Sequence, residues 1–182
     1  MRKATWLAAL AVAAPALLLA GCVGKPADIT PVSPFDSGRY LGKWYEIARM
    51  DHRFERGLSQ VSATYALRDD GGLKVLNRGY QAESKVWKES EGKAYFIDGA
   101  NQGYLKVSFF GPFYGAYVVF DLDPQYQTSL VTGPDKSYFW LLSRTPTLAP
   151  ATQQRLLEKA RALGFDTSKL IMVAQSPAPP QN

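Results

Sequence analysis

The chain has 182 residues, 46% of them hydrophobic, and a formal net charge of +5. This length suits one domain with its own core, and the modest charge, with no clustered basic face, gives no reason to invoke nucleic acid as a partner. A single cysteine excludes an internal disulfide, so in an oxidising compartment the core has to supply the stability.

Residues 1–21 are typical of a secretion signal that is removed from the mature protein. Arg2 and Lys3 form a basic start, and the apolar run over 4–20 has 17 residues, which is short for a bilayer span. Loss of these two residues lowers the basic count from 21 to 19 against 16 acidic residues, so the mature charge is +3.

The segment Leu19-Ala20-Gly21-Cys22 resembles the lipobox of bacterial lipoproteins. The resemblance implies cleavage before Cys22 and an N-acyl, S-diacylglycerol anchor on that cysteine, and two or more chains anchor a protein stably. Val23 stands where an Asp would signal retention in the inner membrane, which favours the outer membrane. The alternative is an ordinary secretion signal, with Cys22 only a small residue near the cleavage site.

Proline-rich segments flank the predicted domain over 35–175. Residues 22–34 contain three prolines and little that is apolar, which predicts a lipidated tether between membrane and domain. The tail over 176–182 has three prolines in seven residues and is predicted to be disordered.

Alternating apolar and polar residues predict an all-β domain. Asp69-Asp70-Gly71-Gly72 is the clearest turn signal, and apolar residues at helical spacing predict one helix over 150–163, stopped by Gly164. A ninth strand over 169–175 is expected to pack on the outside of the domain that the other strands form. The eight main strands are expected near 42–50, 59–68, 73–80, 86–98, 104–110, 115–122, 127–132 and 138–144.

Three motifs in chain order resemble those of the lipocalin family. They are Gly42-Lys43-Trp44 at the first strand, Leu122-Asp123-Pro124-Gln125-Tyr126, where the family usually has Thr-Asp-Tyr, and Arg144 after the last strand. The resemblance implies an eight-stranded antiparallel up-and-down β-barrel with one C-terminal flanking helix and a short ninth strand, which holds a small apolar ligand.

Longer stretches are similar to the bacterial outer-membrane lipoprotein lipocalins, over 45–57, 107–115 and 164–175. This similarity implies a lipid-anchored outer-membrane protein, facing the periplasm, that carries long-chain fatty acids or lysophospholipids for envelope maintenance, storage or transport. No cofactor is implied.

Counting hairpins orients the predicted barrel. Alternate turns of an up-and-down barrel lie at the same end, so Gly42, Trp44, Asp123 and Arg144 gather at one closed end. There Arg144 is expected to stack on Trp44 by a cation–π contact. The loops over 51–58, 81–85, 110–114 and 133–137 then form the open end, where a ligand enters.

Side-chain alternation predicts which residues face the interior. A solid core is the alternative to a ligand cavity for the same residues. The predicted lining consists of Ala48, Ala63, Tyr65, Val75, Asn77, Ala94, Phe96, Leu105, Val107, Phe109, Tyr114, Tyr117, Val119, Tyr138, Trp140 and Leu142.

Two loops at the open end suggest further contacts. Arg53 and Arg56 are candidates for binding a carboxylate or phosphate headgroup, unless they only form local salt bridges with Asp51 and Glu55. The aromatic loop over 110–114 is expected to meet the bilayer, a partner, or a second barrel in a homodimer.

No catalytic or metal-binding set is recognisable. The lone histidine, His52, lies in a loop and is expected to be exposed, and no His/Cys cluster has the spacing of metal ligands. The chain is therefore predicted not to be an enzyme. Two alternatives to a lipid carrier stay open: an envelope scaffold with a filled barrel, and a carrier of heme, pigment or another small ligand.

Overall fold

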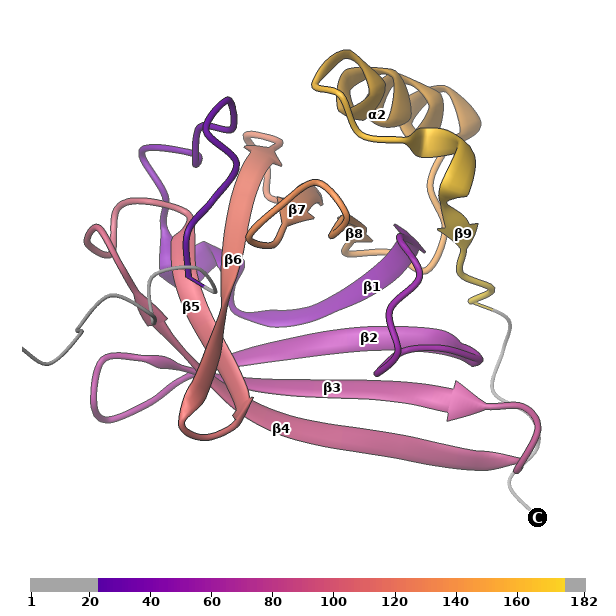
Figure 1. Ribbon diagram of the computed structural model, residues 1–182, viewed down its shortest axis with the longest axis horizontal. Helices are drawn as coiled ribbons and strands as arrows, with labels where there is room; N and C mark the ends of the chain where they lie inside the picture. The colour runs from indigo at the N-terminus through magenta and orange to yellow at the C-terminus, as the bar shows by residue number, and fades with distance from the viewer. Residues whose placement is uncertain (1–22, 176–182) are drawn as a thin grey trace, which may run out of the picture.

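The computed structural model describes residues 23–175, whose nine strands form one antiparallel sheet (Figure 1). Pairing of β1 with β2 closes the sheet into a barrel in the order β2-β3-β4-β5-β6-β7-β8-β1, and β9 adds to β1. The predicted eight-stranded up-and-down barrel is therefore confirmed. The strands are β1 Gly42–Arg49, β2 Leu58–Leu67, β3 Leu73–Gln81, β4 Val86–Phe96, β5 Tyr104–Phe110, β6 Phe113–Leu122, β7 Thr128–Thr132, β8 Trp140–Ser143 and β9 Ile171–Met172.

Short-range hydrogen bonding fixes the turn between β2 and β3. The Asp70 carboxylate accepts from the backbone N–H of Gly72 at 3.1 Å and pairs with Arg68 at 2.7 Å. Gly71 has φ +79°, which L side chains rarely adopt. The predicted turn therefore has the residues that its backbone requires.

A bulge in β1 reverses which side chains face the interior. Glu46 pairs with Leu142, but the next pair is Ala48 with Leu141, so one residue is added on β1. Ala48 consequently lies in the buried cluster outside the barrel. The sequence-based placement of Ala48 in the cavity is wrong, because simple alternation does not anticipate the extra residue.

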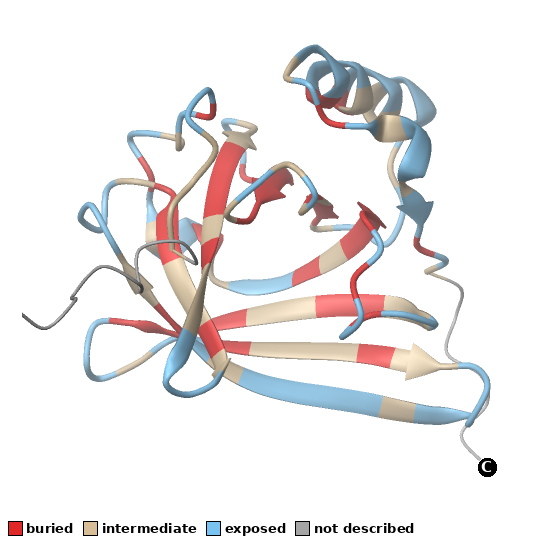
Figure 2. Cartoon of the chain, in the orientation of Figure 1, coloured by how far each residue is buried: buried red, intermediate tan, exposed pale blue. Residues whose placement is uncertain are grey.

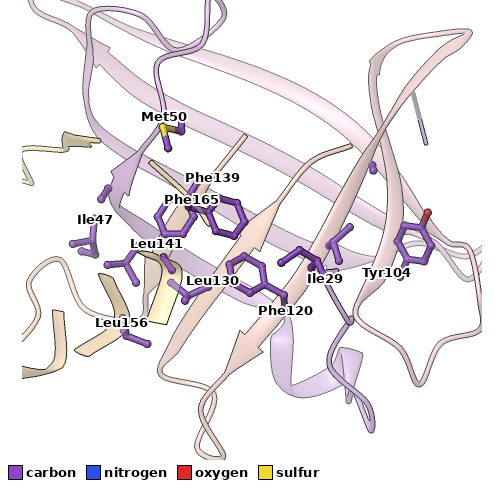
Figure 3. Close-up of a cluster of buried hydrophobic side chains, with 14 residues drawn as sticks. Ile29, Ile47, Met50, Tyr104, Phe120, Leu130, Phe139, Leu141, Leu156 and Phe165 are labelled. Atoms are coloured by element: carbon purple, nitrogen blue, oxygen red, sulfur yellow. The ribbon is translucent and has the colours of Figure 1, made fainter. Parts of the chain in front are cut away.

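Helix α2, Pro150–Ala162, covers one outer face of the barrel (Figure 1). Pro150 occupies its first turn, and Gly164, with φ +82°, follows its end. Figure 3 shows Leu156 and Phe165 packed with β-strand residues in the resulting cluster. Its buried members are Ile29, Ile47, Ala48, Met50, Tyr104, Ala116, Val118, Phe120, Leu130, Phe139, Leu141, Leu156, Ala160 and Phe165.

Two short helices were not predicted. The first, α1 (Ser37–Tyr40), precedes β1 and carries the buried Tyr40. The second, η1 (Thr167–Lys169), connects α2 to β9. Both are too short to show a helical period in the sequence, and the Asp residue before each caps it by accepting a backbone N–H.

The N-terminal segment over 23–34 packs against the barrel, which differs from the tether expected for it. Ile29 is 1% exposed and belongs to the cluster beneath α2. Val32 exchanges backbone hydrogen bonds with Val119 and Gly103, at 2.8 and 2.9 Å. The segment thus contributes to the core. Residues 1–22 and 176–182, which include the expected signal, Cys22 and the expected disordered tail, lie outside the described residues.

The barrel wall is uneven at its open end. Strand β3 pairs along its whole length with β4, over 86–94, whereas β5 pairs with β4 only over 93–96. The part of β4 over 86–91 therefore extends beyond the β5–β6 hairpin, and most of it is exposed (Figure 2). One side of the open end is consequently lower than the other.

Candidate ligand-binding site

Trp44 and Arg144 meet at the closed end. The Trp44 ring is fully buried, and Cζ of Arg144 lies 3.9 Å from the ring centroid. The guanidinium also donates to the backbone oxygens of Arg39, Lys43 and Tyr126, at 2.7, 2.9 and 3.2 Å. Gly42 has φ +87°, and a Cβ there would lie 3.5 Å from an Arg144 nitrogen. These contacts join β1, β8 and the β6–β7 turn at one end of the barrel.

Asp123 organises the β6–β7 turn and is not directed into the barrel. One of its carboxylate oxygens accepts from the backbone N–H groups of Gln127 and Thr128, the latter at 2.7 Å, and the other accepts from Gln125 at 3.2 Å. The same turn positions Tyr126, whose hydroxyl accepts a hydrogen bond from the Asp36 N–H at 2.9 Å. Asp123 therefore has a structural role at the closed end.

Aromatic side chains fill the closed half of the barrel. Phe35 and Tyr40 lie 5.1 Å apart, and Tyr40 is 4.7 Å from Trp44. The Tyr117 hydroxyl is 2.8 Å from the hydroxyls of both Tyr40 and Tyr65. Burial raises the pKa of Tyr40 to about 12, so this hydroxyl stays protonated at neutral pH. This half is a core with satisfied polar atoms.

The predicted lining divides by depth. Tyr65, Val75, Ala94, Leu105, Val119 and Leu142 are buried members of the cluster that fills the closed half. Partly buried side chains pack against that cluster and retain exposed surface: Ala63, Phe96, Val107, Phe109, Tyr117 and Trp140. Asn77 is also partly buried and lies opposite Ala63 in the β2–β3 register. Ala63, Phe96 and Tyr117 lie in the closed half, respectively opposite Trp44, 6.3 Å from Phe35 and bonded to Tyr40. The partly buried apolar side chains of the open half are therefore Val107, Phe109 and Trp140.

Tyr114 lies on the outer surface of the wall, which corrects its placement in the cavity. Its ring is 6.4 Å from Tyr95, and the Lys106 ammonium lies 5.2 Å from its centroid. Tyr117 and Val119 belong to the interior cluster, so the alternation of β6 directs Tyr114 outward. Tyr114 is three residues from Tyr117, and in a regular strand such an odd separation places two side chains on opposite faces.

His52 is buried at the open end, although its position in a loop predicted exposure. Its ring stacks on Tyr138 at 4.5 Å and on Phe54 at 5.3 Å, and it lies 5.2 Å from Trp140. The imidazole Nε2 has no hydrogen-bond partner among the described residues. Burial lowers the pKa of His52, which favours the neutral ring. Tyr138 thus lies beside the mouth, against the loop over 50–57.

A buried charged cluster inside the barrel was missed by the sequence analysis. Glu46, Arg49 and Glu55 are 3%, 1% and 6% exposed. Arg49 donates to the Glu46 carboxylate at 2.7 Å and to the backbone oxygens of Glu55 and Leu58, at 2.9 and 3.2 Å. The Trp140 indole N–H donates to the Glu55 carboxylate at 3.1 Å.

Pairing registers place this charged cluster on the interior side. Glu46 is two residues from Trp44 on the same face, and beyond the bulge Arg49 pairs with Trp140. Burial raises the pKa of Glu46, and the neighbouring Glu55 charge raises it further, while burial also raises the pKa of Glu55. The signal in the sequence was a charged residue at an inward position of β1, two residues after Trp44.

The two rim arginines have different surroundings. Both are exposed, and Arg56 pairs with Asp51 at 2.6 Å on the surface. This agrees with the local salt bridge considered for Arg56, whereas the Glu55 side chain turns inward to Trp140. Arg53 is therefore the better candidate for a headgroup contact, because its loop neighbour Arg56 already has an acidic partner.

Other surface features lie away from the barrel interior. Phe110 and Phe113, at the tip of the β5–β6 hairpin, are 77% and 74% exposed. A groove of about 440 Å³ lies outside the barrel, lined by Ile47, Pro146, Thr147, Leu148, Gln153, Met172, Val173 and Gln175.

Within the described part of the chain, no cluster of three or more His, Cys, Asp or Glu side chains is placed to hold a metal ion. No helix of residues 23–175 has the length and apolar character needed to cross a membrane.

The chain is similar to known proteins over most of its length. A family model described as a lipocalin-like domain matches residues 35–175. The outer membrane lipoprotein Blc of Vibrio cholerae is 58% identical over 160 residues, which cover 87% of this chain and 94% of that protein. The Escherichia coli K12 protein of the same name is 54% identical over 168 residues, covering 91% and 95%.

The solved structures agree with this similarity. Insecticyanin from the tobacco hornworm Manduca sexta superposes with a TM-score of 0.68 at 25% identity, covering 85% of this chain and 88% of that one. The identity to the two bacterial proteins places this chain in the outer membrane as a lipid-anchored protein. From the matched family model and these relatives, the chain belongs to the lipocalin family.

Proposed function

We propose that the protein carries one long-chain fatty acid or lysophospholipid in the open half of its barrel. Its family and fold support binding of a lipid or another small hydrophobic ligand, and the finer assignment comes from the interior. Val107 and Phe109 are only partly buried and offer apolar surface above a filled closed half. An acyl chain could lie along these two side chains and bury its apolar surface against them.

The burial of the acyl chain supplies the driving force. Removal of about 200 Å² of apolar surface from water contributes roughly 5 kcal/mol at about 25 cal/mol per Å², and the ordering of the chain offsets part of this gain. The lower wall beside the β5–β6 hairpin gives the lipid a side entrance. Exchange would be reversible and would involve no covalent chemistry, so we propose no catalytic residues.

Membrane attachment completes the proposal. Cys22 would carry the acyl anchor after removal of residues 1–21. Because Ile29 and Val32 are fixed against the barrel, only the few residues between Cys22 and the packed segment would separate the barrel from the bilayer. This short spacing would hold the protein near a source of lipid.

Native mass spectrometry of the full chain, purified from bacterial membranes in detergent, tests the carrier function. We expect co-purified fatty acid or lysophospholipid at one molecule per chain. Val107→Trp should abolish it, because the larger ring would occupy the free apolar space. Lys106→Trp changes the adjacent, outward position and should retain the lipid. A wild-type chain that carries no lipid would contradict the proposal, and a visible chromophore would point to a pigment or heme carrier.

A second candidate role rests on the exposed hairpin tip. Phe110 and Phe113 present apolar rings to solvent, and exposed apolar groups often mark contact sites. We propose contact with the bilayer or with a second barrel in a homodimer. Phe110→Ser with Phe113→Ser should lower vesicle binding in the first case and convert dimer to monomer in the second, measured by flotation and light scattering. No change in either measurement would exclude this role.

A further inference from the structure

The charged cluster inside the barrel has one more acidic than basic group. Its acidic members are Glu46 and Glu55, and Arg49 is its only cation. The Arg49 guanidinium pairs with Glu46 at 2.7 Å and donates to the backbone oxygens of Glu55 and Leu58, while its Nε has no hydrogen-bond partner among the described residues. The Glu55 carboxylate accepts no hydrogen bond from a cationic side chain among the described residues, only one from the neutral Trp140 indole N–H at 3.1 Å, although the Arg49 charge is close enough to lower its pKa.

This arrangement is costly unless something compensates the surplus charge. Both carboxylates are more than nine-tenths buried, and an uncompensated ionised group in such a place is strongly disfavoured. One oxygen of each, Glu46 Oε2 and Glu55 Oε1, has no hydrogen-bond partner among the described residues. The interior thus offers free acceptor atoms that suit a positively charged donor.

Aromatic rings beside Glu55 suit the same kind of group. Trp140 binds Glu55 directly and lies 6.1 Å from Tyr138. Both rings are partly exposed, and Phe54, next to Glu55 in the chain, is 62% exposed. Aromatic faces attract ammonium groups, and together with a carboxylate they form a recognised setting for such cations. A fatty-acid carboxylate placed here would meet like charge instead.

We propose that Glu55, with Trp140 and Tyr138, selects lysophospholipids whose headgroup ends in an ammonium group over anionic lipids. The proposal rests on the carrier function above and narrows its ligand. The acyl chain lies against Val107 and Phe109, and the ammonium group donates to the free Glu55 oxygen. The headgroup thereby supplies the cation that the protein lacks.

Competition between two lipids tests the selection. The full chain in detergent receives an equimolar mixture of lysophosphatidylethanolamine and lysophosphatidylglycerol with the same oleoyl chain, and native mass spectrometry measures the two complexes. We expect the ammonium lipid to be favoured by about tenfold, the scale of one hydrogen bond between charged groups. Glu55→Gln keeps an acceptor for Trp140 but removes the charge, so the ratio should fall towards one.

Two controls make the result specific. Glu83→Gln removes one negative charge from the exposed β3–β4 turn and should leave the ratio unchanged. N-acetyl-lysophosphatidylethanolamine has no positive charge and should lose the preference in the wild-type chain, which tests the idea even if Glu55→Gln does not fold. Equal binding of both lipids, or an unchanged ratio in Glu55→Gln, would overturn the headgroup selection but not the carrier function. Binding of neither lipid would overturn the carrier function as well.

Discussion

The closed and open halves of the barrel bury polar groups in different ways. At the closed end, Arg144 donates to three backbone oxygens, and the Tyr117 hydroxyl bonds to the hydroxyls of Tyr40 and Tyr65. In the open half, Glu55 lacks a cationic partner and His52 Nε2 lacks any partner among the described residues. Satisfied buried polar groups stabilise a fold, whereas each unsatisfied one costs free energy unless water or a ligand compensates it.

The two halves therefore have separate tasks. Mutations in the closed half should change the free energy of unfolding without a direct effect on lipid affinity. Mutations in the open half should change affinity, and loss of its unpaired charge should even stabilise the protein. Four experiments test this division.

Trp44→Ala should cause the largest loss. Removal of a fully buried ring from a packed core costs about 3–5 kcal/mol, and Arg144 would lose its cation–π partner. Urea unfolding measures this change. Trp87 provides the matched control, because its ring lies on the outer face of the β3–β4 hairpin beside Tyr80 and Arg78, and Trp87→Ala should cost about 1 kcal/mol. If both substitutions lowered the free energy of unfolding equally, Trp44 would stabilise the fold no more than a tryptophan on the outer face.

Arg144→Ala should lower the free energy of unfolding by about 2 kcal/mol, since several charge-assisted hydrogen bonds are lost. Lipid affinity of the folded fraction should stay the same in a fluorescence titration. Arg56→Ala, which breaks a surface ion pair, should cost about 0.5 kcal/mol or less. If Arg144→Ala abolished lipid binding in a protein of unchanged stability, the two ends of the barrel would have to be exchanged.

Leu105→Trp and Val107→Trp should separate the two depths of the interior. Leu105 is 2% exposed in the filled half, so the larger ring should overpack it and cost about 1–3 kcal/mol. Val107 retains free surface, so its variant should stay within about 1 kcal/mol of wild type and lose lipid instead. Thermal unfolding measures the stability of both variants, and lipid extraction from the same samples measures their lipid content. Equal destabilisation would indicate a barrel that is filled throughout.

The pH dependence of stability should show the smallest effect. The pKa values of Glu46 and Glu55 are raised in the folded state by burial. Their ionisation is disfavoured there, so stability should decrease as the pH rises above 4.5, their ordinary pKa. The pKa of His52 is lowered by burial, so this group has the opposite effect: its contribution to stability is lost as the pH falls below 6.5. The urea midpoint of Glu55→Gln should decline less steeply between pH 4.5 and 8 than that of the wild type. Identical slopes would mean that Glu55 does not have a raised pKa in the folded protein.

Local patterns in the sequence determined most of the fold. Alternation predicted eight strands, and β5 over 104–110 has the predicted bounds. Gly42, Trp44 and Arg144 predicted a closed end, where the structure stacks the last two at 3.9 Å. The strands and turns are predictable because side-chain period and turn chemistry involve residues close in sequence, whereas the closed end was expected from the resemblance to the lipocalin family and the hairpin count.

Tertiary structure alone decided the details of the open half. The bulge between Glu46 and Ala48 depends on how β1 pairs with β8, about a hundred residues away, and it exchanged Ala48 for Arg49 on the interior side. Burial of His52 depends on Tyr138 and Trp140, and that of Glu55 on Trp140. Periodicity within one strand carries no information about such distant contacts, because register and burial are set when the barrel closes.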